Sequence, residues 1–103
     1  MKLDDMNYFV KTVNAKSINK AAKILFMTQP ALSRKISAIE QELGFPLLER
    51  SQQGIVLTKI GQKVYDDCVK ILELYTACNR QWQDMFLQEK KQTTIVRIVA
   101  LPM

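Results

Sequence analysis

The sequence predicts a mainly α-helical protein in which three short helices and a two-stranded hairpin precede one long helix. Three observations lead to this fold class. Before residue 44, apolar residues recur every three or four positions in three segments, which is the period of amphipathic helices. Two short β-prone runs follow, separated by a turn that contains Gly54. Apolar residues then recur at close to heptad spacing over 60–85.

The first helix is predicted over residues 3–13. Its apolar face comprises Leu3, Met6, Phe9, Val10 and Val13. Asp4 and Asp5 lie in its first turn, where the positive end of the helix dipole favours acidic side chains. The apolar pattern breaks at 14–16, so the helix is expected to end there.

A second, short helix is predicted over 18–25, with Ser17 as its N-cap. The paired Ala21 and Ala22 lie on its inner face, where small side chains let a neighbouring helix approach closely. The next residues, 26–27, are expected to form a tight apolar turn.

The third helix is predicted to begin after the N-cap Thr28 and to run to Leu43. Pro30 is tolerated in its first turn, and Gly44 is a suitable left-handed residue to end it. Its apolar stripe comprises Leu32, Ile36, Ile39 and Leu43. The opposite face carries hydrogen-bonding groups and cations, and the residues on or near it are Pro30, Ser33, Arg34, Ser37 and Gln41. Such a helix can pack on a core and still present donors to an anion.

The hairpin is predicted from the β-prone runs 47–50 and 54–57, with its turn at 51–54. Two strands alone are marginal, so the hairpin must pack against the helices. Helix, helix, turn, helix and hairpin is the order of a winged helix-turn-helix.

The long helix is predicted from the cap Thr58 to about Glu89. Its apolar seam comprises Ile60, Val64, Cys68, Ile71, Tyr75, Cys78, Trp82 and Met85. An exposed stripe of this kind is a liability in a monomer. We therefore expect a linker helix that forms a homodimer, rather than a helix folded back on its own domain. The expected dimer contacts are Val64, Cys68, Ile71, Tyr75, Cys78 and Trp82.

The sequence divides into three predicted regions: 1–57 is the winged helix-turn-helix, 58–89 is the linker helix, and 90–103 is a hinge with a strand. The strand-like run 93–100 has no partner strand in the sequence. It is interpreted as the first strand of a truncated effector domain, or as a mobile tail.

Charge is distributed unevenly. Residues 1–63 contain ten Lys or Arg and five Asp or Glu, whereas 64–103 contain five of each. No acid lies between Asp5 and Glu40, and that interval holds Lys11, Lys16, Lys20, Lys23, Arg34 and Lys35. A surface with this charge would attract DNA. An ordinary basic face that contacts only solvent would have the same charge. A membrane surface is disfavoured because no broad apolar face is left after core packing.

Composition excludes several classes of function. The only cysteines are Cys68 and Cys78, and there is no histidine. A zinc site and His-based catalysis are therefore excluded, and no metal or other cofactor is expected. The two thiols are expected to be reduced apolar fillers in a cytoplasmic, nucleoid-associated protein. No apolar run reaches the roughly 18 residues of a membrane span. We do not expect an enzyme.

The sequence resembles the N-terminal part of LysR-type transcriptional regulators of bacteria. The resemblance covers residues 1 to about 90 and rests on Phe9-Val10, Ser17-Ile18, Ala21-Ala22, Leu25, Thr28-Gln29-Pro30-Ala31-Leu32-Ser33, Ile36, Leu43-Gly44, Leu47-Leu48-Glu49-Arg50, Leu57-Thr58 and Gly61. It implies a winged helix-turn-helix joined to a dimerising linker helix. It also implies that the tail begins a ligand-binding domain, which would hold any inducer site. The sequence departs from the family pattern at two places. A basic residue that family members often carry in the wing is missing at 51–53, and Ile60 stands where family members usually have Ala.

We expect the third helix to enter the major groove of double-stranded DNA by its N-terminal half. Arg34 is the candidate for a bidentate contact to guanine, and Gln29 for adenine. Pro30 suits a thymine methyl, and Ser33 suits a base or a phosphate. Phosphate contacts are expected from Lys16, Ser17, Thr28, Lys35 and Arg50. Gln52 and Gln53 are expected near the minor groove.

The predicted function is a sequence-specific transcriptional regulator that binds an interrupted palindrome as a dimer. The sequence leaves open whether the full-length protein forms a tetramer. Two alternatives also remain: an architectural protein that binds DNA without sequence preference, and a helical adaptor whose long helix is its functional surface. The sequence does not name the operator, the inducer or the sign of regulation.

Overall fold

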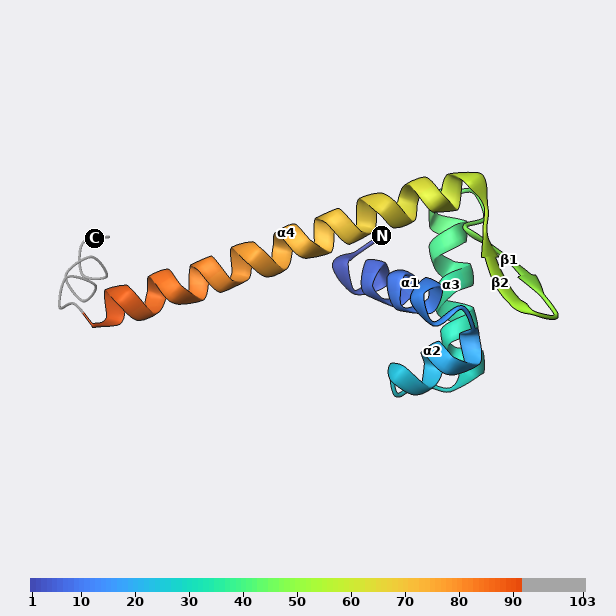
Figure 1. Ribbon diagram of the computed structural model, residues 1–103, viewed down its shortest axis with the longest axis horizontal. Coiled ribbons are helices and arrows are strands. Elements are labelled where there is room, and N and C mark those ends of the chain that lie inside the picture. Colours follow the sequence, from blue (N-terminus) through green and yellow to red (C-terminus); the bar gives the residue numbers. More distant parts are fainter. Residues whose placement is uncertain (92–103) are drawn as a thin grey trace. The chain divides into compact units, whose positions relative to one another are not determined.

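The computed structural model describes residues 1–91. Its elements, in order, are α1 (Leu3–Ala15), α2 (Ile18–Ile24), α3 (Gln29–Leu43), β1 (Leu48–Ser51), β2 (Gly54–Leu57) and α4 (Lys59–Lys90) (Figure 1). The predicted order of elements is confirmed, and the fold is mainly helical. The strand expected at 93–100 lies outside the described residues. The chain divides after Leu72 into two units, which we call the head (1–72) and, for residues 73–90 of α4, the distal segment.

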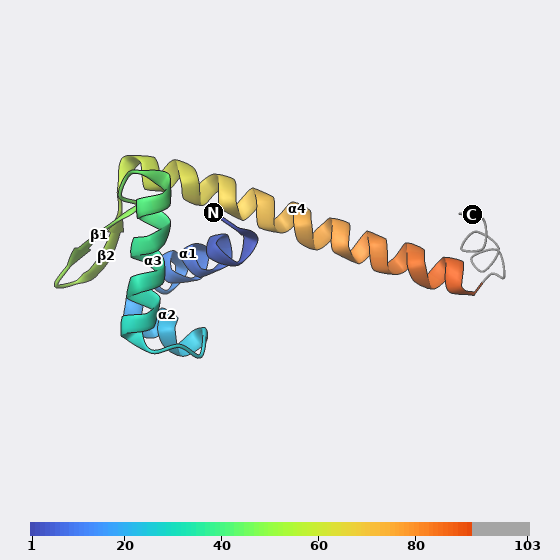
Figure 2. The ribbon, with the colours of Figure 1, turned by 180° about the vertical axis from the view of Figure 1, so that it is seen from behind.

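The head is built around α1, α2 and α3, which pack against one another, while the hairpin extends to one side of them (Figures 1 and 2). Their apolar faces meet in one core, formed by Phe9, Ile18, Ala21, Ala22, Leu32, Ile36, Ile39, Leu47, Leu48 and Cys68. The side chain of Phe9 is fully buried. Burial of a side chain of this size stabilises a fold by about 1.5–3 kcal/mol.

The predicted caps of α2 and α3 are confirmed. The Oγ of Ser17 accepts a hydrogen bond from the Lys20 N–H at 3.2 Å, and the Oγ1 of Thr28 accepts one from the Ala31 N–H at 3.2 Å. Each such cap stabilises its helix by about 1 kcal/mol. Gly44 ends α3 with a φ of 89°, as the sequence predicts.

The predicted end of α1 is wrong by two residues, since the helix continues through Asn14 and Ala15. It ends where Lys16 adopts a left-handed conformation with a φ of 60°. Asn14 also has a tertiary partner, because its Oδ1 accepts a 2.6 Å hydrogen bond from the Tyr65 hydroxyl. The apolar pattern also did not predict that Thr12 is buried. Its hydroxyl donates a hydrogen bond to the Tyr8 carbonyl at 2.7 Å.

The hairpin is antiparallel, with Leu48 paired to Leu57 and Ser51 paired to Gly54. The first strand begins and ends one residue later than predicted, and Leu47, just before it, is fully buried in the core. The Oε2 atom of Glu40 accepts hydrogen bonds from the N–H groups of Leu47 at 2.6 Å and Leu48 at 3.1 Å. This carboxylate therefore fixes the start of β1 to α3.

Two glycines permit close approaches in the head. A Cβ at Gly54, which has a φ of 127°, would lie 2.6 Å from the Lys16 carbonyl oxygen. A Cβ at Gly61 would lie 2.1 Å from the Leu47 carbonyl oxygen. The hairpin thus rests directly on the backbone between α1 and α2, and the first turn of α4 rests on the backbone just before β1.

The first turns of α4 belong to the head. Thr58 caps the helix through its Oγ1, which accepts the Gly61 N–H at 2.9 Å. Tyr65 packs edge-on against Phe9, with ring centroids 6.4 Å apart. Cys68 is only 2% exposed, and burial raises the pKa of its thiol. The expectation that Cys68 contacts a second subunit is therefore wrong, because the head itself covers it; Val64 also packs partly against this core.

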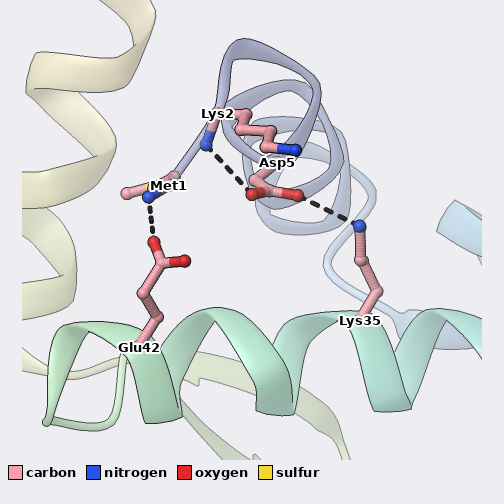
Figure 3. A network of polar contacts seen from close by, with 5 residues as sticks. All are labelled: Met1, Lys2, Asp5, Lys35 and Glu42. Atoms are coloured by element: carbon pink, nitrogen blue, oxygen red, sulfur yellow. Dashed lines mark hydrogen bonds and ion pairs between the residues drawn. The ribbon is translucent and has the colours of Figure 1, made fainter.

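A polar network joins α1 to α3 at two points (Figure 3). Lys35 of α3 forms an ion pair with Asp5 at 3.2 Å, and the amino group of Met1 lies against the carboxylate of Glu42. Asp5 also accepts the Lys2 N–H at 3.0 Å. That backbone hydrogen bond, and then the Lys35 ammonium, hold the pKa of Asp5 below its usual value.

Candidate nucleic-acid interface

A hollow of about 510 Å³ lies between the start of α2, the start of α3 and the hairpin. Six of the predicted DNA-binding residues line it, namely Lys16, Ser17, Gln29, Arg50, Gln52 and Gln53. They come from segments far apart in the sequence, so the fold brings them together. Asn19 and Lys20 also line this hollow and were missed by the sequence reasoning. Their position could have identified them, because both lie in the first turn of α2, directly after Ser17, which itself lines the hollow.

A second hollow, of about 640 Å³, lies on the other side of Arg50. Its lining is Ser33, Arg34, Ser37, Ala38, Glu40, Gln41 and Arg50. Arg50, on β1 of the hairpin, borders both hollows. Ser37 and Gln41 were predicted on this outer face but not as site residues.

Gln29 and Ser33 lie one turn apart on α3, and the Gln29 Nε2 donates a 3.2 Å hydrogen bond to the Ser33 Oγ. This contact restrains the Gln29 carboxamide before any ligand is bound. Its Oε1 remains as an acceptor, which an exocyclic amine on a base edge can use.

Three predicted residues lie outside both hollows. Thr28 and Pro30 are exposed in the first turn of α3, and the Thr28 hydroxyl is used as the N-cap. Lys35 is turned toward α1, where it pairs with Asp5 and lies 5.5 Å from the centre of the Tyr8 ring. The phosphate contact expected of Lys35 stays a prediction, and it would compete with this surface ion pair to Asp5.

The surface around the two hollows is basic. Lys16, Lys20, Arg34 and Arg50 line them, and the single carboxylate among the lining residues is that of Glu40. Glu40 is already engaged by two backbone N–H groups. The surface therefore presents cations, hydroxyls and carboxamides together, which are the groups that bind phosphates and base edges.

Residues 1–91 contain no cluster of three or more His, Cys, Asp or Glu able to hold a metal ion. None of the helices in this part of the chain is long and apolar enough to cross a membrane.

The distal segment of α4 carries a second surface of interest. Its exposed large apolar side chains are Leu74, Tyr75, Trp82, Met85, Phe86 and Leu87. At helical spacing all of these except Leu87 fall on one side, together with Cys78. The rings of Tyr75 and Trp82 meet edge-on, with centroids 6.3 Å apart. Leu74 and Phe86 are additions to the predicted seam.

Comparison with known proteins explains this combination of elements. Residues 3–62 match the family model described as "Bacterial regulatory helix-turn-helix protein, lysR family". The chain belongs to the LysR family. The helices α1–α3 and the hairpin accordingly form the winged helix-turn-helix domain of this family.

Curated LysR relatives match the same region. The HTH-type transcriptional regulator BudR of Klebsiella aerogenes is 40% identical over 77 residues, which is 75% of this chain and 54% of BudR. BenM of Acinetobacter baylyi is 42% identical over 72 residues, 70% of this chain and 24% of BenM. The chain thus spans about half of BudR's length and about a quarter of BenM's.

Solved LysR structures have the same fold. The DNA-binding domain of BenM, solved with catB site 1 DNA, has a TM-score of 0.82 at 34% identity, covering 86% of this chain and 96% of that one. The CbnR DNA-binding domain, solved with DNA, has a TM-score of 0.77 at 35% identity, covering 82% and 98%.

Proposed function

We propose that this LysR-family chain is a sequence-specific regulator that binds an interrupted palindrome as a dimer, each head placing α3 in the major groove and its hairpin near the minor groove. The observation that carries the proposal is the pair of hollows flanking Arg50, lined by residues of α2, α3 and the hairpin. The DNA complexes of the BenM and CbnR domains, which have the same fold, support it further.

Within this proposal, α3 reads bases and its surroundings bind phosphate. Arg34 is exposed and borders the second hollow, so its guanidinium can reach the O6 and N7 atoms of a guanine. Gln29 presents its restrained carboxamide in the first hollow. Lys16, Lys20 and Arg50 surround these readers and can each neutralise a phosphate.

The dimer is proposed to form through the distal segment. A stripe that includes Leu74 at 66% and Trp82 at 55% exposure is unfavourable in water. A second copy of the same helix would cover it. The contacts we assign to the dimer are now Leu74, Tyr75, Cys78, Trp82, Met85 and Phe86, with Ile71 as a flanking contact.

The curated relatives are longer than the matched region. We propose that inducer binding and any tetramer belong to such additional sequence and not to the head. Because the proposed partner is DNA, we also propose that the protein acts in the cytoplasm, at the nucleoid.

Methylation interference on a bound duplex tests the groove assignment. Methylation of guanine N7, which projects into the major groove, should abolish binding at two clusters related by a dyad. Major-groove recognition by two-fold helix-turn-helix dimers separates such clusters by about 10 base pairs or a multiple of it. Interference confined to adenine N3 in the minor groove would contradict the proposal.

A further inference from the structure

The first turns of α4 contact the two segments that lead into the first hollow. On one side, the Thr58 N–H donates to the Leu47 carbonyl at 3.0 Å, and Gly61 lies against the same carbonyl. These contacts hold the segment that enters the hairpin. On the other side, the Tyr65 hydroxyl donates to the Asn14 Oδ1 at 2.6 Å, near the end of α1. One helix therefore holds the chain just before both walls of the hollow.

Lys16 lines the first hollow and has an unusual backbone conformation. Its φ is 60°, and within residues 1–91 only Phe26 is another non-glycine residue with a positive φ. The left-handed conformation is unfavourable for a residue with a Cβ, and such a residue keeps it where the surrounding contacts hold the backbone. Glycine would relieve this strain at the end of α1. Glycine would also remove a cation from the hollow.

Three contacts surround the strained turn at Lys16. Directly after it, Ser17 caps α2. Against it lies the hairpin, so close that a Cβ at Gly54 would lie 2.6 Å from the Lys16 carbonyl oxygen. Just before it, the Tyr65 hydroxyl holds the carboxamide of Asn14. The cap belongs to α2 and the close approach to the hairpin, so the contact with Asn14 is the one that α4 contributes.

Core packing does not require the Tyr65 hydroxyl. The Tyr65 ring packs edge-on against Phe9, and a phenylalanine ring would make the same contact. Asn14 is exposed, so water would satisfy its carboxamide in the absence of Tyr65. An exposed hydrogen bond of this kind adds little to the stability of a fold. Its specific consequence is that it ties the residue two positions before Lys16 to α4.

We propose that Tyr65 is a positioning residue for DNA binding, which acts through Asn14 to hold the turn at Lys16 against the hairpin before DNA arrives. The inference rests on the proposed function, in which the Lys16 ammonium binds a phosphate. Tyr65 lines neither of the two hollows, so it acts through the residues that do. A head without this hydrogen bond must order the turn during binding. Its apparent affinity then falls with the fraction of heads that have the competent form.

The test measures the DNA affinity of the full chain by fluorescence anisotropy, on a duplex that the parent selects from a randomised pool. Tyr65→Phe and Asn14→Ala should each weaken binding about threefold per head, as expected for one lost hydrogen bond. The double variant should lose no more than either single variant, since both remove the same contact. Tyr8→Phe removes the same atom from α1 and should bind like the parent. Additive losses, or an equal loss in Tyr8→Phe, would overturn the proposal.

Salt dependence separates positioning from a merely structural role. Lys16→Gln should lower the slope of log Kd against log salt concentration by about one per head in the parent, because one phosphate contact is lost. In the Tyr65→Phe background the slope should already be lower, and Lys16→Gln should change it less. A Tyr65→Phe variant with reduced stability but unchanged affinity and slope would overturn the proposal. A parent that selects no sequence from the pool would instead contradict the proposed function, so the two failures are distinguishable.

Discussion

At the scale of single residues, the neighbours Arg34 and Lys35 of α3 have different surroundings. Arg34 is exposed beside the second hollow, whereas Lys35 forms an ion pair with Asp5 of α1. The sequence predicted a base contact for Arg34 and a phosphate contact for Lys35, but it gave no sign of the ion pair. That pairing follows from where α1 packs, which is a tertiary property.

Replacement of Arg34 tests base reading. If Arg34 makes a bidentate contact to guanine, Arg34→Ala should lose about 1–3 kcal/mol of discrimination between the specific site and an unrelated duplex. Fluorescence anisotropy on both duplexes measures this difference. Lys35→Ala is the matched control and should leave the discrimination unchanged. Equal losses on both duplexes for Arg34→Ala would leave Arg34 only a phosphate role.

Gly54 tests the seating of the hairpin. Because its Cβ would lie 2.6 Å from the Lys16 carbonyl oxygen, Gly54→Ala should push the hairpin away from the first hollow and weaken DNA binding. Gly44→Ala is the control, since Gly44 also has a positive φ but a Cβ added there would meet no atom within 4 Å. Gly44→Ala should lower stability by about 1 kcal/mol with little effect on affinity. Identical affinity losses would show that backbone strain, not the clash, matters.

Asp5 gives a pH dependence with a defined sign. Its pKa is lowered in the folded head by the Lys2 N–H and by Lys35, so its contribution to stability is present above the unfolded pKa of about 3.9. That contribution is lost as the pH falls through the folded value. Urea unfolding should therefore show Asp5→Asn less stable than the parent at neutral pH, with the gap narrowing below about pH 4. A gap that is independent of pH would exclude the charge of Asp5 as its cause.

At the scale of elements, the distal segment of α4 is the part whose apolar residues lack a partner. Trp82→Glu places a charge in the proposed seam and should shift the protein from dimer to monomer in sedimentation equilibrium. Thr76→Glu makes the same charge change on the opposite side of the helix and should leave the dimer intact. A parent that sediments as a monomer would contradict the proposed dimer outright.

The elements themselves were largely predictable because each has a local signal. Ser17, Thr28 and Thr58 cap the helices as their sequence positions indicate, and Gly44 ends α3. The errors arose where a tertiary contact overrides the pattern. Asn14 continues α1 and accepts a hydrogen bond from Tyr65, a residue 51 positions away, and no local rule contains that contact.

The candidate site was predictable in its composition and less so in its arrangement. Residue type and helix face identified eight of the side chains that line the two hollows, but not Asn19 or Lys20. Glu40 was not predicted as the residue that fixes β1, because its partners lie across a loop. Cys68 was placed in the dimer seam because heptad spacing cannot tell that the head covers the first turns of α4.

At the scale of the whole molecule, charge and apolar exposure are divided between two regions. The excess positive charge lies in residues 1–63, where both hollows are found. The distal segment has a near-continuous apolar side. This division suits a molecule in which one region meets a polyanion and the other meets a copy of itself. If the proposed dimer has two-fold symmetry, the DNA that it binds must have two-fold symmetry as well.

The most direct test of that claim is to select duplexes from a randomised pool with the purified chain and to sequence the bound fraction. We expect enrichment of an inverted repeat interrupted by a spacer, with guanines in both half-sites that are no longer enriched in the pool selected by Arg34→Ala. Enrichment of a motif without a dyad, or no enrichment over the input pool, would contradict it.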